Sequence, residues 1–356
     1  MRVPLLDLKA QYHKLKPALD EAALRVLASG RHVMGPELEA FEKELAAHLQ
    51  LPYAVGVASG TDALLSAAMA LCIGPGDDVV TPAYSFFATP ETAVRLGARP
   101  VFCDIEEDGF NADINDFLNK ITPKTRLLLP VHLFGVQMGL DKLVDTGIPV
   151  MEDASQTLAV GIGQKTACAT LSFFPSKNLG AAGDGGAVVL RDEKLADKIG
   201  IMRQHGSRPK YVHHVWGGNF RMDPIQAAIL RVKLQELPKW NAARARNAAR
   251  YTERLAGTPV RTPKDAPGHV WHHYVIRAPR REDLKKHLAA HEIDCEVYYP
   301  LALHLQPCFT HYGYKAGDCP RAEAASQDSL AIPVHPDLSD DQIDFVAETI
   351  RNFYRG

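Results

Sequence analysis

The chain has 356 residues, of which 46% are hydrophobic and 23% charged, the profile of an ordinary globular protein. Its 40 basic and 42 acidic side chains nearly cancel, so the charge gives no reason to expect nucleic acid or a membrane surface as a partner. No stretch resembles a membrane span or a signal peptide, and we therefore expect a cytoplasmic protein.

The cysteines and histidines give no sign of a disulfide framework or a metal site. Six cysteines are scattered without a CxxC pair, and no HExxH spacing occurs among the 15 histidines. The neighbours His213-His214 and His272-His273 would face opposite sides of a strand. We therefore expect free cysteines and no bound metal.

Strands and helices alternate through the first two thirds of the chain. Several of the strands are apolar throughout, as expected when helices cover both faces of a parallel sheet. Predicted helices occupy 17–29, 36–49, 63–71, 90–96, 114–121 and 139–145, and predicted strands 54–58, 79–81, 100–105, 126–132, 148–153 and 187–190. This order predicts a largely parallel α/β domain.

A different pattern begins near residue 257. A long helical region over 223–255, broken near Pro238, leads to a strand over 270–276, a helix over 281–291, a strand over 295–299 and a last helix starting at Ser339. We predict a large domain over residues 1–255 and a small α+β domain over 256–356, because a chain of this length exceeds one core. The basic run over 242–250 is interpreted as a solvated helix face.

One lysine stands apart from the charged surface of the chain. Lys177 lies five residues after Ser172 and just before the glycines at 180, 183, 185 and 186, where the backbone can turn sharply or approach a ligand closely. An amine among apolar and glycine neighbours is a candidate for Schiff-base chemistry, whereas most lysines are solvated surface residues.

Two further features fall at the ends of predicted strands. The turn Ser59–Ala63 joins a strand to a helix, where free backbone N–H groups form an anion site, although a simple helix cap by Ser59 or Thr61 explains it equally well. Asp153 ends an apolar strand and would face the ligand crevice of a parallel sheet, with a helix cap as the alternative.

A single ligand explains the conjunction of these features. Pyridoxal 5'-phosphate has a phosphate for the strand–helix turn, an aldehyde for a lysine and a ring nitrogen that a buried carboxylate keeps protonated. The stretch Tyr84–Thr89 adds an aromatic side chain that could stack on the ring. We therefore expect pyridoxal phosphate as the cofactor.

The chain resembles the DegT/StrS-type nucleotide-sugar aminotransferases, which belong to the fold-type-I pyridoxal phosphate enzymes. The motifs that carry the resemblance run nearly from end to end and lie at 7–12, 34–42, 58–64, 82–89, 130–135, 152–156, 172–186 and 218–223. The resemblance implies a three-layer α/β sandwich with a mostly parallel central sheet, followed by a smaller C-terminal domain.

The resemblance also implies roles for residues around the cofactor ring. Lys177 would be the Schiff-base lysine, which also moves the proton during transamination. Asp153 would pair with the ring nitrogen, Gln156 would lie beside the ring hydroxyl, and Phe86 would stack on the ring face.

The phosphate would be held by residues of two subunits. Gly60, Thr61 and Asp62 would contribute through the strand–helix turn and Ser172 through its hydroxyl. Asn219 would reach the phosphate from the neighbouring subunit, so the resemblance implies a homodimer with shared active sites.

The substrates that the resemblance implies are L-glutamate and a nucleotide-linked keto-hexose. Arg221 and His304 match positions that can face the sugar nucleotide, and the segment around His304 favours a UDP- or dTDP-linked 3-keto sugar. Alternatives are a 4-keto sugar, a carbocyclic ketone, a sugar dehydration on the same scaffold, or a regulator that binds cofactor and sugar without catalysis. Retention of Lys177 argues against the dehydratase.

Overall fold

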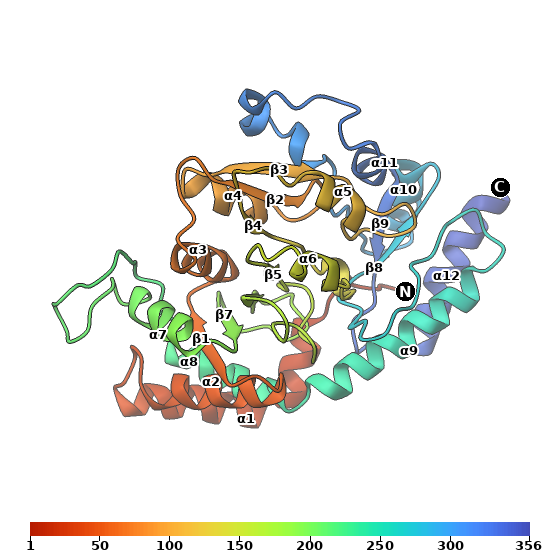
Figure 1. Ribbon diagram of the computed structural model, residues 1–356. Coiled ribbons are helices and arrows are strands. Elements are labelled where there is room, and N and C mark those ends of the chain that lie inside the picture. The colour runs from red at the N-terminus through yellow and green to blue at the C-terminus, as the bar shows by residue number, and fades with distance from the viewer.

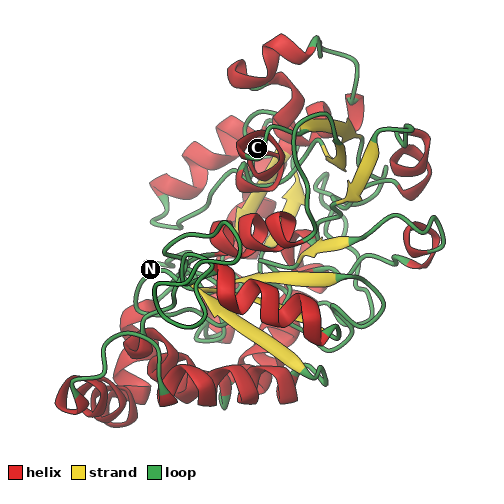
Figure 2. Cartoon of the chain, turned by 60° about the vertical axis from the view of Figure 1, so that its left-hand side comes forward, coloured by secondary structure: helices red, strands yellow, loops and turns green.

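The computed structural model describes residues 1–356, and a sheet covered by helices on both faces forms its centre (Figure 1, Figure 2). Its strands are β1 (Tyr53–Val57), β2 (Asp78–Pro82), β3 (Arg99–Cys103), β4 (Thr125–Leu128), β5 (Met151–Asp153), β6 (Cys168–Ser172) and β7 (Gly186–Leu190). They form the rows β3-β2-β4 and β5-β6-β7-β1, and a parallel bridge between Leu128 and Val150 joins the rows. Only β7 runs antiparallel to its neighbours. The predicted mostly parallel sheet is confirmed.

Two layers of helices complete the sandwich. The helices of this part of the chain are α2 (Pro36–His48), α3 (Gly60–Ala70), α4 (Ala88–Arg95), α5 (Ile114–Asn119), α6 (Asp141–Val144), α7 (Glu193–Met202) and α8 (Pro224–Leu234). Consecutive residues of β7 face opposite layers: Val188 packs with α3, α4 and α7, and Val189 packs with α2 and α8. Because both faces of the strand are covered, β7 is apolar along its whole length, as the sequence predicts.

The first helix is longer than predicted. The structure starts α1 at Leu8 and ends it at Ser29, so that Pro17, the first residue of the predicted helix, lies inside the helix. Asp7 makes the earlier start possible, since its side chain accepts a hydrogen bond from the N–H of Ala10. Packing of Val26 against α8 supports the helix in spite of the proline.

The C-terminal part contains α9 (Leu237–Leu255), β8 (Tyr274–Arg277), α10 (Arg281–Ala290), α11 (Pro320–Asp328), β9 (Ser329–Ile332) and α12 (Asp340–Arg355). Short 3-10 turns cover Leu133–Gly135, Leu303–Leu305 and Pro307–Tyr312. The strand predicted over 295–299 was wrong, because only Glu296 pairs there, with Ala331. The partner of β8 is β9, which the sequence did not reveal. The capping box at Ser339 is confirmed.

The C-terminal part has a core of its own, to which α9 contributes Tyr251 and Leu255. Val3, from the opposite end of the chain, is buried in the same core and pairs with Ile293. A division between residues 255 and 256 stays a prediction.

No helix combines the length and apolar character that a bilayer crossing requires.

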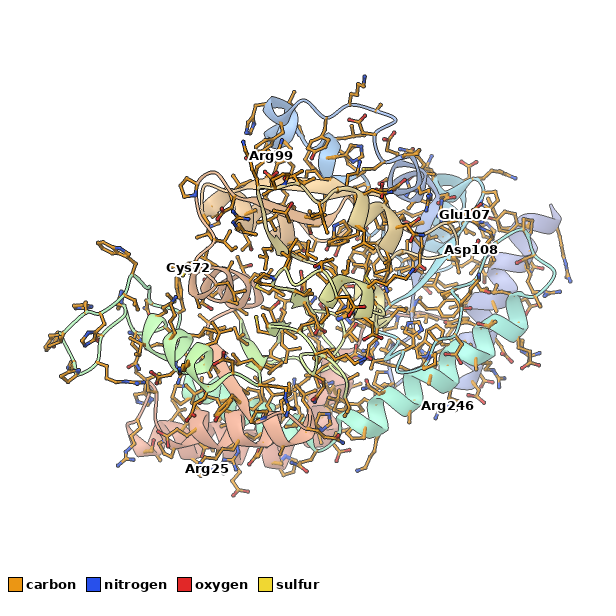
Figure 3. The ribbon with its side chains drawn as sticks, viewed as in Figure 1. Arg25, Cys72, Arg99, Glu107, Asp108 and Arg246 are labelled. Carbon is orange, nitrogen blue, oxygen red and sulfur yellow. The ribbon has the colours of Figure 1, made fainter.

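The basic run of α9 does not form a single solvated face. Arg246 points away from the body of the molecule, as does Arg25 of α1 (Figure 3). Arg244, two residues before Arg246, is buried and donates hydrogen bonds to the carbonyl groups of Trp271 and His272. Part of this run is therefore structural, because helical spacing places Arg244 on the inner face.

Candidate active site

A cavity of about 430 Å³ opens where β1, β2, β5 and β6 end, and residues of the C-terminal part close it. The residues predicted around the cofactor that line it are Gly60, Thr61, Phe86, Asp153, Gln156, Ser172 and Lys177. They come from four separate stretches of the chain. Such an edge is the usual ligand site of parallel α/β sheets.

Lys177 lies on a turn after β6, held by a hydrogen bond from its N–H to the carbonyl of Phe174. Its Nζ forms no hydrogen bond or ion pair, while burial lowers its pKa to about 8, against the opposing effect of the Asp153 charge. At neutral pH the unprotonated fraction of this amine is therefore much larger than that of an ordinary surface lysine, and a nucleophile must be unprotonated. A Cβ at Gly180 would collide with the carbonyl of Pro175, which explains one glycine of the cluster.

Asp153 is buried at the end of β5 with both carboxylate oxygens occupied. Oδ2 accepts a hydrogen bond of 2.7 Å from the hydroxyl of Thr89, and Oδ1 accepts one of 3.1 Å from the N–H of Ser155. No helix begins at Asp153, so the alternative of a helix cap is wrong. The carboxylate is fixed in the cavity wall, where it can meet a positively charged group.

The turn after β1 combines a helix cap with free amides. Ser59 caps α3 by accepting the N–H of Asp62 at 3.0 Å, so this amide is already in use. The N–H groups of Gly60 and Thr61 donate to no other group, and both residues line the cavity. A Cβ at Gly60 would lie 2.6 Å from the Cβ of Ser172, so only glycine leaves room there. The start of α3 thus offers two amides to an anion.

Gln156 and Phe86 lie on different walls of the cavity. The side-chain oxygen of Gln156 accepts the N–H of Phe134 at 2.7 Å, and its Nε2 donates to the hydroxyl of Tyr299 at 3.1 Å. Phe86 remains 57% exposed, with its ring centroid 6.3 Å from that of Tyr299. A flat ligand can therefore find an uncovered aromatic face here.

Four predicted residues do not line this cavity, and one of them is Asp62, whose N–H donates to Ser59. Asn219 is exposed, and Arg221 pairs with Val57 at the edge of the sheet. His304 is only 1% exposed, and its Nε2 contacts Glu323 at 3.1 Å. The expectation that His304 faces the sugar is not met in this chain, because the imidazole is enclosed by protein.

The sequence missed several cavity residues. Tyr299 lies in the segment wrongly predicted as a strand. Thr89, in the stretch singled out for its aromatics, does not line the cavity but donates a hydrogen bond to Asp153, which does. His272 and His273 both line the cavity, although their spacing led us to dismiss them as metal ligands. Of these residues only Tyr299 stands at the end of a predicted strand, so that position was a signal for Tyr299 alone.

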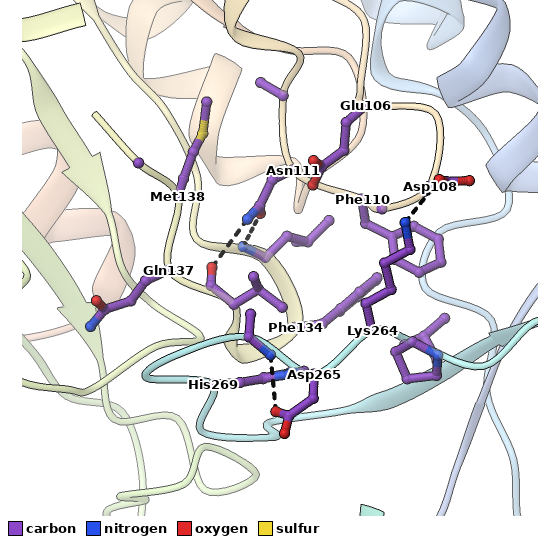
Figure 4. A pocket seen from close by; sticks show the side chains of 18 of the residues that line it. Glu106, Asp108, Phe110, Asn111, Phe134, Gln137, Met138, Lys264, Asp265 and His269 are labelled. Carbon is purple, nitrogen blue, oxygen red and sulfur yellow. Dashed lines mark hydrogen bonds and ion pairs between the residues drawn. The ribbon is translucent and has the colours of Figure 1, made fainter. Parts of the chain in front are cut away.

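A larger cavity of about 540 Å³ shares His273 with the first one (Figure 4). Its lysine, Lys264, forms an ion pair of 2.9 Å with Asp108 and so offers no free amine. Its wall also carries the acidic residues Glu106 and Asp265. This cavity lacks the lysine–aspartate arrangement of the smaller one.

The smaller cavity fits pyridoxal phosphate in its chemistry. An unpartnered amine, a buried carboxylate, two free amides and an uncovered aromatic face converge on it, and they match the aldehyde, ring nitrogen, phosphate and ring of that cofactor. Residues 14–351 match the DegT/DnrJ/EryC1/StrS aminotransferase family. The chain belongs to this family. The resemblance inferred from the motifs is thereby confirmed.

Members of the DegT/DnrJ/EryC1/StrS family resemble this chain over its whole length. The "Pleiotropic regulatory protein" of Geobacillus stearothermophilus is 42% identical over 369 residues, covering 100% of this chain and 99% of that protein. The "dTDP-3-amino-3,4,6-trideoxy-alpha-D-glucose transaminase" of Streptomyces venezuelae is 42% identical over 364 residues, covering 99% of this chain and 96% of that protein.

A solved structure supports the fold. The crystal structure of S. venezuelae DesV in complex with ketimine intermediate superposes with a TM-score of 0.97 at 42% identity, and the match covers 100% of this chain and 99% of that one. The predicted fold, a three-layer α/β aminotransferase with a smaller C-terminal part, is confirmed.

Proposed function

We propose that the protein is a pyridoxal phosphate-dependent aminotransferase that moves an amino group from L-glutamate to a nucleotide-linked keto-hexose. The observation that carries this proposal is the unpartnered amine of Lys177 in the same cavity as the buried carboxylate of Asp153. Family membership and the match of the cavity to the cofactor support it.

When bound, the cofactor supplies an aldehyde that bonds covalently to an amine, and a ring that withdraws electrons from the carbon atom attached to that amine. Lys177 anchors the aldehyde and, once released, carries a proton to and from the substrate carbon, for which a pKa near 8 suits it. Asp153 keeps the ring nitrogen protonated by its negative charge.

The remaining cavity residues bind and orient the cofactor in this proposal. The amides of Gly60 and Thr61 and the hydroxyl of Ser172 hold the phosphate. Gln156, fixed by Phe134, lies beside the ring hydroxyl. The exposed face of Phe86 stacks on the ring.

The proposed acceptor is a UDP- or dTDP-linked 3-keto sugar. The names of relatives support this class, since they describe transaminases that act on dTDP- and UDP-linked sugars carrying nitrogen at carbon 3. Arg221 is the residue of this chain that we propose for the sugar nucleotide. A 4-keto sugar or a carbocyclic ketone is the alternative acceptor on the same machinery.

A homodimer is the proposed active unit. Asn219 is exposed on its own subunit and outside its own cavity, as a residue that serves a neighbouring active site must be. It lies in the loop between α7 and α8, which projects from the body of the molecule (Figure 1). On this loop Tyr211 is 78% and Trp216 91% exposed, which favours burial against a second copy.

A second candidate function is regulation without catalysis. The name of the Geobacillus relative, a pleiotropic regulatory protein, favours this alternative. A regulator would bind the cofactor without transferring its amine, so addition of L-glutamate separates the two functions.

Substitution of Lys177 tests the proposal. The Lys177→Ala protein should bind pyridoxal phosphate but lack the visible absorbance of the lysine-bound cofactor, and it should be inactive. Lys264→Ala is the matched control, because Lys264 lies in the other cavity and is paired with Asp108. An unchanged spectrum in Lys177→Ala would refute the role of Lys177.

A further inference from the structure

Asn178, the residue after the proposed anchoring lysine, has a side chain whose orientation is determined by its partners. Its Nδ2 donates to the carbonyl of Val270 at 2.7 Å and to Oδ1 of Asn241 at 3.0 Å. A backbone carbonyl can only accept, so the amide nitrogen of Asn178 must face Val270. Oδ1 of Asn178 is consequently the atom that faces His272, at 3.1 Å from Nδ1.

This orientation assigns the proton of His272. Because Oδ1 of Asn178 is an acceptor, Nδ1 of His272 must carry the hydrogen that it donates. Burial and the charges of nearby Lys177 and Arg244 hold the pKa of His272 well below its usual value, so the ring is neutral at physiological pH. In a neutral ring with a proton on Nδ1, the other nitrogen, Nε2, bears a free lone pair.

The ring is held rigidly in the cavity wall. His272 is 3% exposed, and Nη1 of Arg244 donates to the carbonyl groups of Trp271 and His272 at 3.2 and 3.3 Å. Nε2 forms no hydrogen bond within the chain, and the surrounding protein does not enclose it completely. It therefore presents an acceptor to the cavity that contains Lys177.

The charged and titratable groups around His272 favour one occupant for this acceptor. Those that face it are His273 from the same segment, Arg244 from α9 and Lys177 from the turn after β6. His273 is neutral, because burial and the same two cations hold its pKa well below the usual value. Arg244 donates through Nη1 to two backbone carbonyl groups, and its Nε is fully enclosed without a partner. Lys177, unlike Arg244, lines the same cavity as His272 and has no hydrogen-bond partner.

We propose that Nε2 of His272 accepts a hydrogen bond from the ammonium group of Lys177 whenever that lysine is not joined to the cofactor. His272 is then a positioning residue that sets the pH range in which the amine is free to react. The inference rests on the proposed role of Lys177. Four rotatable bonds allow the lysine to reach Nε2 after its release.

The test follows capture of the cofactor by full-length protein from which the cofactor has been removed. The rate at which added pyridoxal phosphate develops the lysine-bound absorbance should rise with pH. The midpoint of the unchanged chain should lie above 8, because a pKa of about 8 describes the amine without a hydrogen-bond partner. In His272→Phe the ammonium loses its acceptor, and the midpoint should fall by about one pH unit. In His272→Gln, whose amide oxygen can take the place of Nε2, the midpoint should stay near that of the unchanged chain.

The outcomes separate this inference from the proposed function. An equal midpoint in the unchanged chain and in His272→Phe would overturn the inference, and so would an equal shift in both variants. If the unchanged chain never develops the absorbance, the proposed function itself fails. Should His272→Phe not fold, ¹⁵N NMR of the holoenzyme decides: a proton on Nδ1 of His272 supports the assignment, and a proton on Nε2 overturns it.

Discussion

The hydroxyl of Thr89 donates a hydrogen bond of 2.7 Å to Oδ2 of Asp153, and both side chains are buried. A carboxylate can only accept, so the single hydrogen of the Thr89 hydroxyl is used for Asp153. The hydroxyl of Ser85, 3.0 Å from that of Thr89, therefore donates its hydrogen to the Thr89 oxygen. This chain of hydroxyls fixes the orientation of the carboxylate. The carboxylate that the proposed mechanism requires is thus held in place before the cofactor binds.

Removal of this hydrogen bond should weaken catalysis without abolishing it. A hydrogen bond to a charged group contributes about 1.5–3 kcal/mol, so Thr89→Val should lower kcat about 10- to 100-fold and shift the cofactor spectrum. Thr89→Ser keeps the hydroxyl and should remain near the activity of the unchanged chain. Steady-state kinetics and absorbance spectra check both. Equal losses in the two variants would show that packing matters, and not the hydrogen bond.

The close approach of Gly60 to Ser172 should make position 60 intolerant of a side chain. A methyl group there would lie 2.6 Å from the Cβ of Ser172, and overpacking of this kind typically costs about 1–3 kcal/mol. Gly60→Ala should therefore release pyridoxal phosphate more readily, measured as a higher Kd by absorbance titration. Gly74→Ala is the matched control, since nothing lies within 4 Å of its Cβ. Equal affinity in both variants would refute this account of the phosphate turn.

The proposed contact between subunits predicts the effect of a charge at position 219. Asn219→Asp would place a negative charge beside the phosphate of the neighbouring subunit, and cofactor retention during dialysis should fall. Asn115→Asp introduces the same charge at an exposed site on α5 and serves as the control. Sedimentation should show a dimer for both variants. Full retention in Asn219→Asp would argue against the shared site.

Two enclosed histidines should make the fold sensitive to acid. Burial lowers the pKa of His269 and of His335 from 6.5 to about 4. The unfolded chain therefore binds more protons than the folded one between pH 6.5 and 4, and stability is lost as the pH falls through this range. Each histidine contributes up to about 1.4 kcal/mol per pH unit.

Urea unfolding at pH 7.5, 6 and 5 measures this loss. The free energy of unfolding should fall steadily, and His335→Gln should show a smaller fall because the group that takes up the proton is gone. A free energy of unfolding that is the same at pH 7.5 and pH 5 would contradict the prediction.

The sheet and the cofactor side chains were predictable because each depends on a short local pattern. Apolar runs such as the one ending at Asp153 reveal strands whose two faces are covered, and the residue after each run lies at the ligand edge. The free amides at Gly60 follow from a strand that turns directly into a helix.

The features that were missed depend on contacts between distant parts of the chain. The inner position of Arg244 is set by the carbonyl groups at 271 and 272, which nothing in the basic run of α9 reveals. His304 matches the motif of a substrate-facing residue, yet its contact with Glu323 lies in the interior. The early start of α1 depends on the helix cap at Asp7, whose stabilising effect outweighs the destabilising effect of Pro17 inside the helix.

The response of the purified, cofactor-loaded protein to L-glutamate distinguishes transamination from cofactor binding without catalysis. L-glutamate should remove the visible absorbance of the lysine-bound cofactor, and a UDP- or dTDP-linked 3-keto sugar should then restore it while gaining an amino group. An absorbance that does not change on addition of L-glutamate would contradict transamination and favour the regulator.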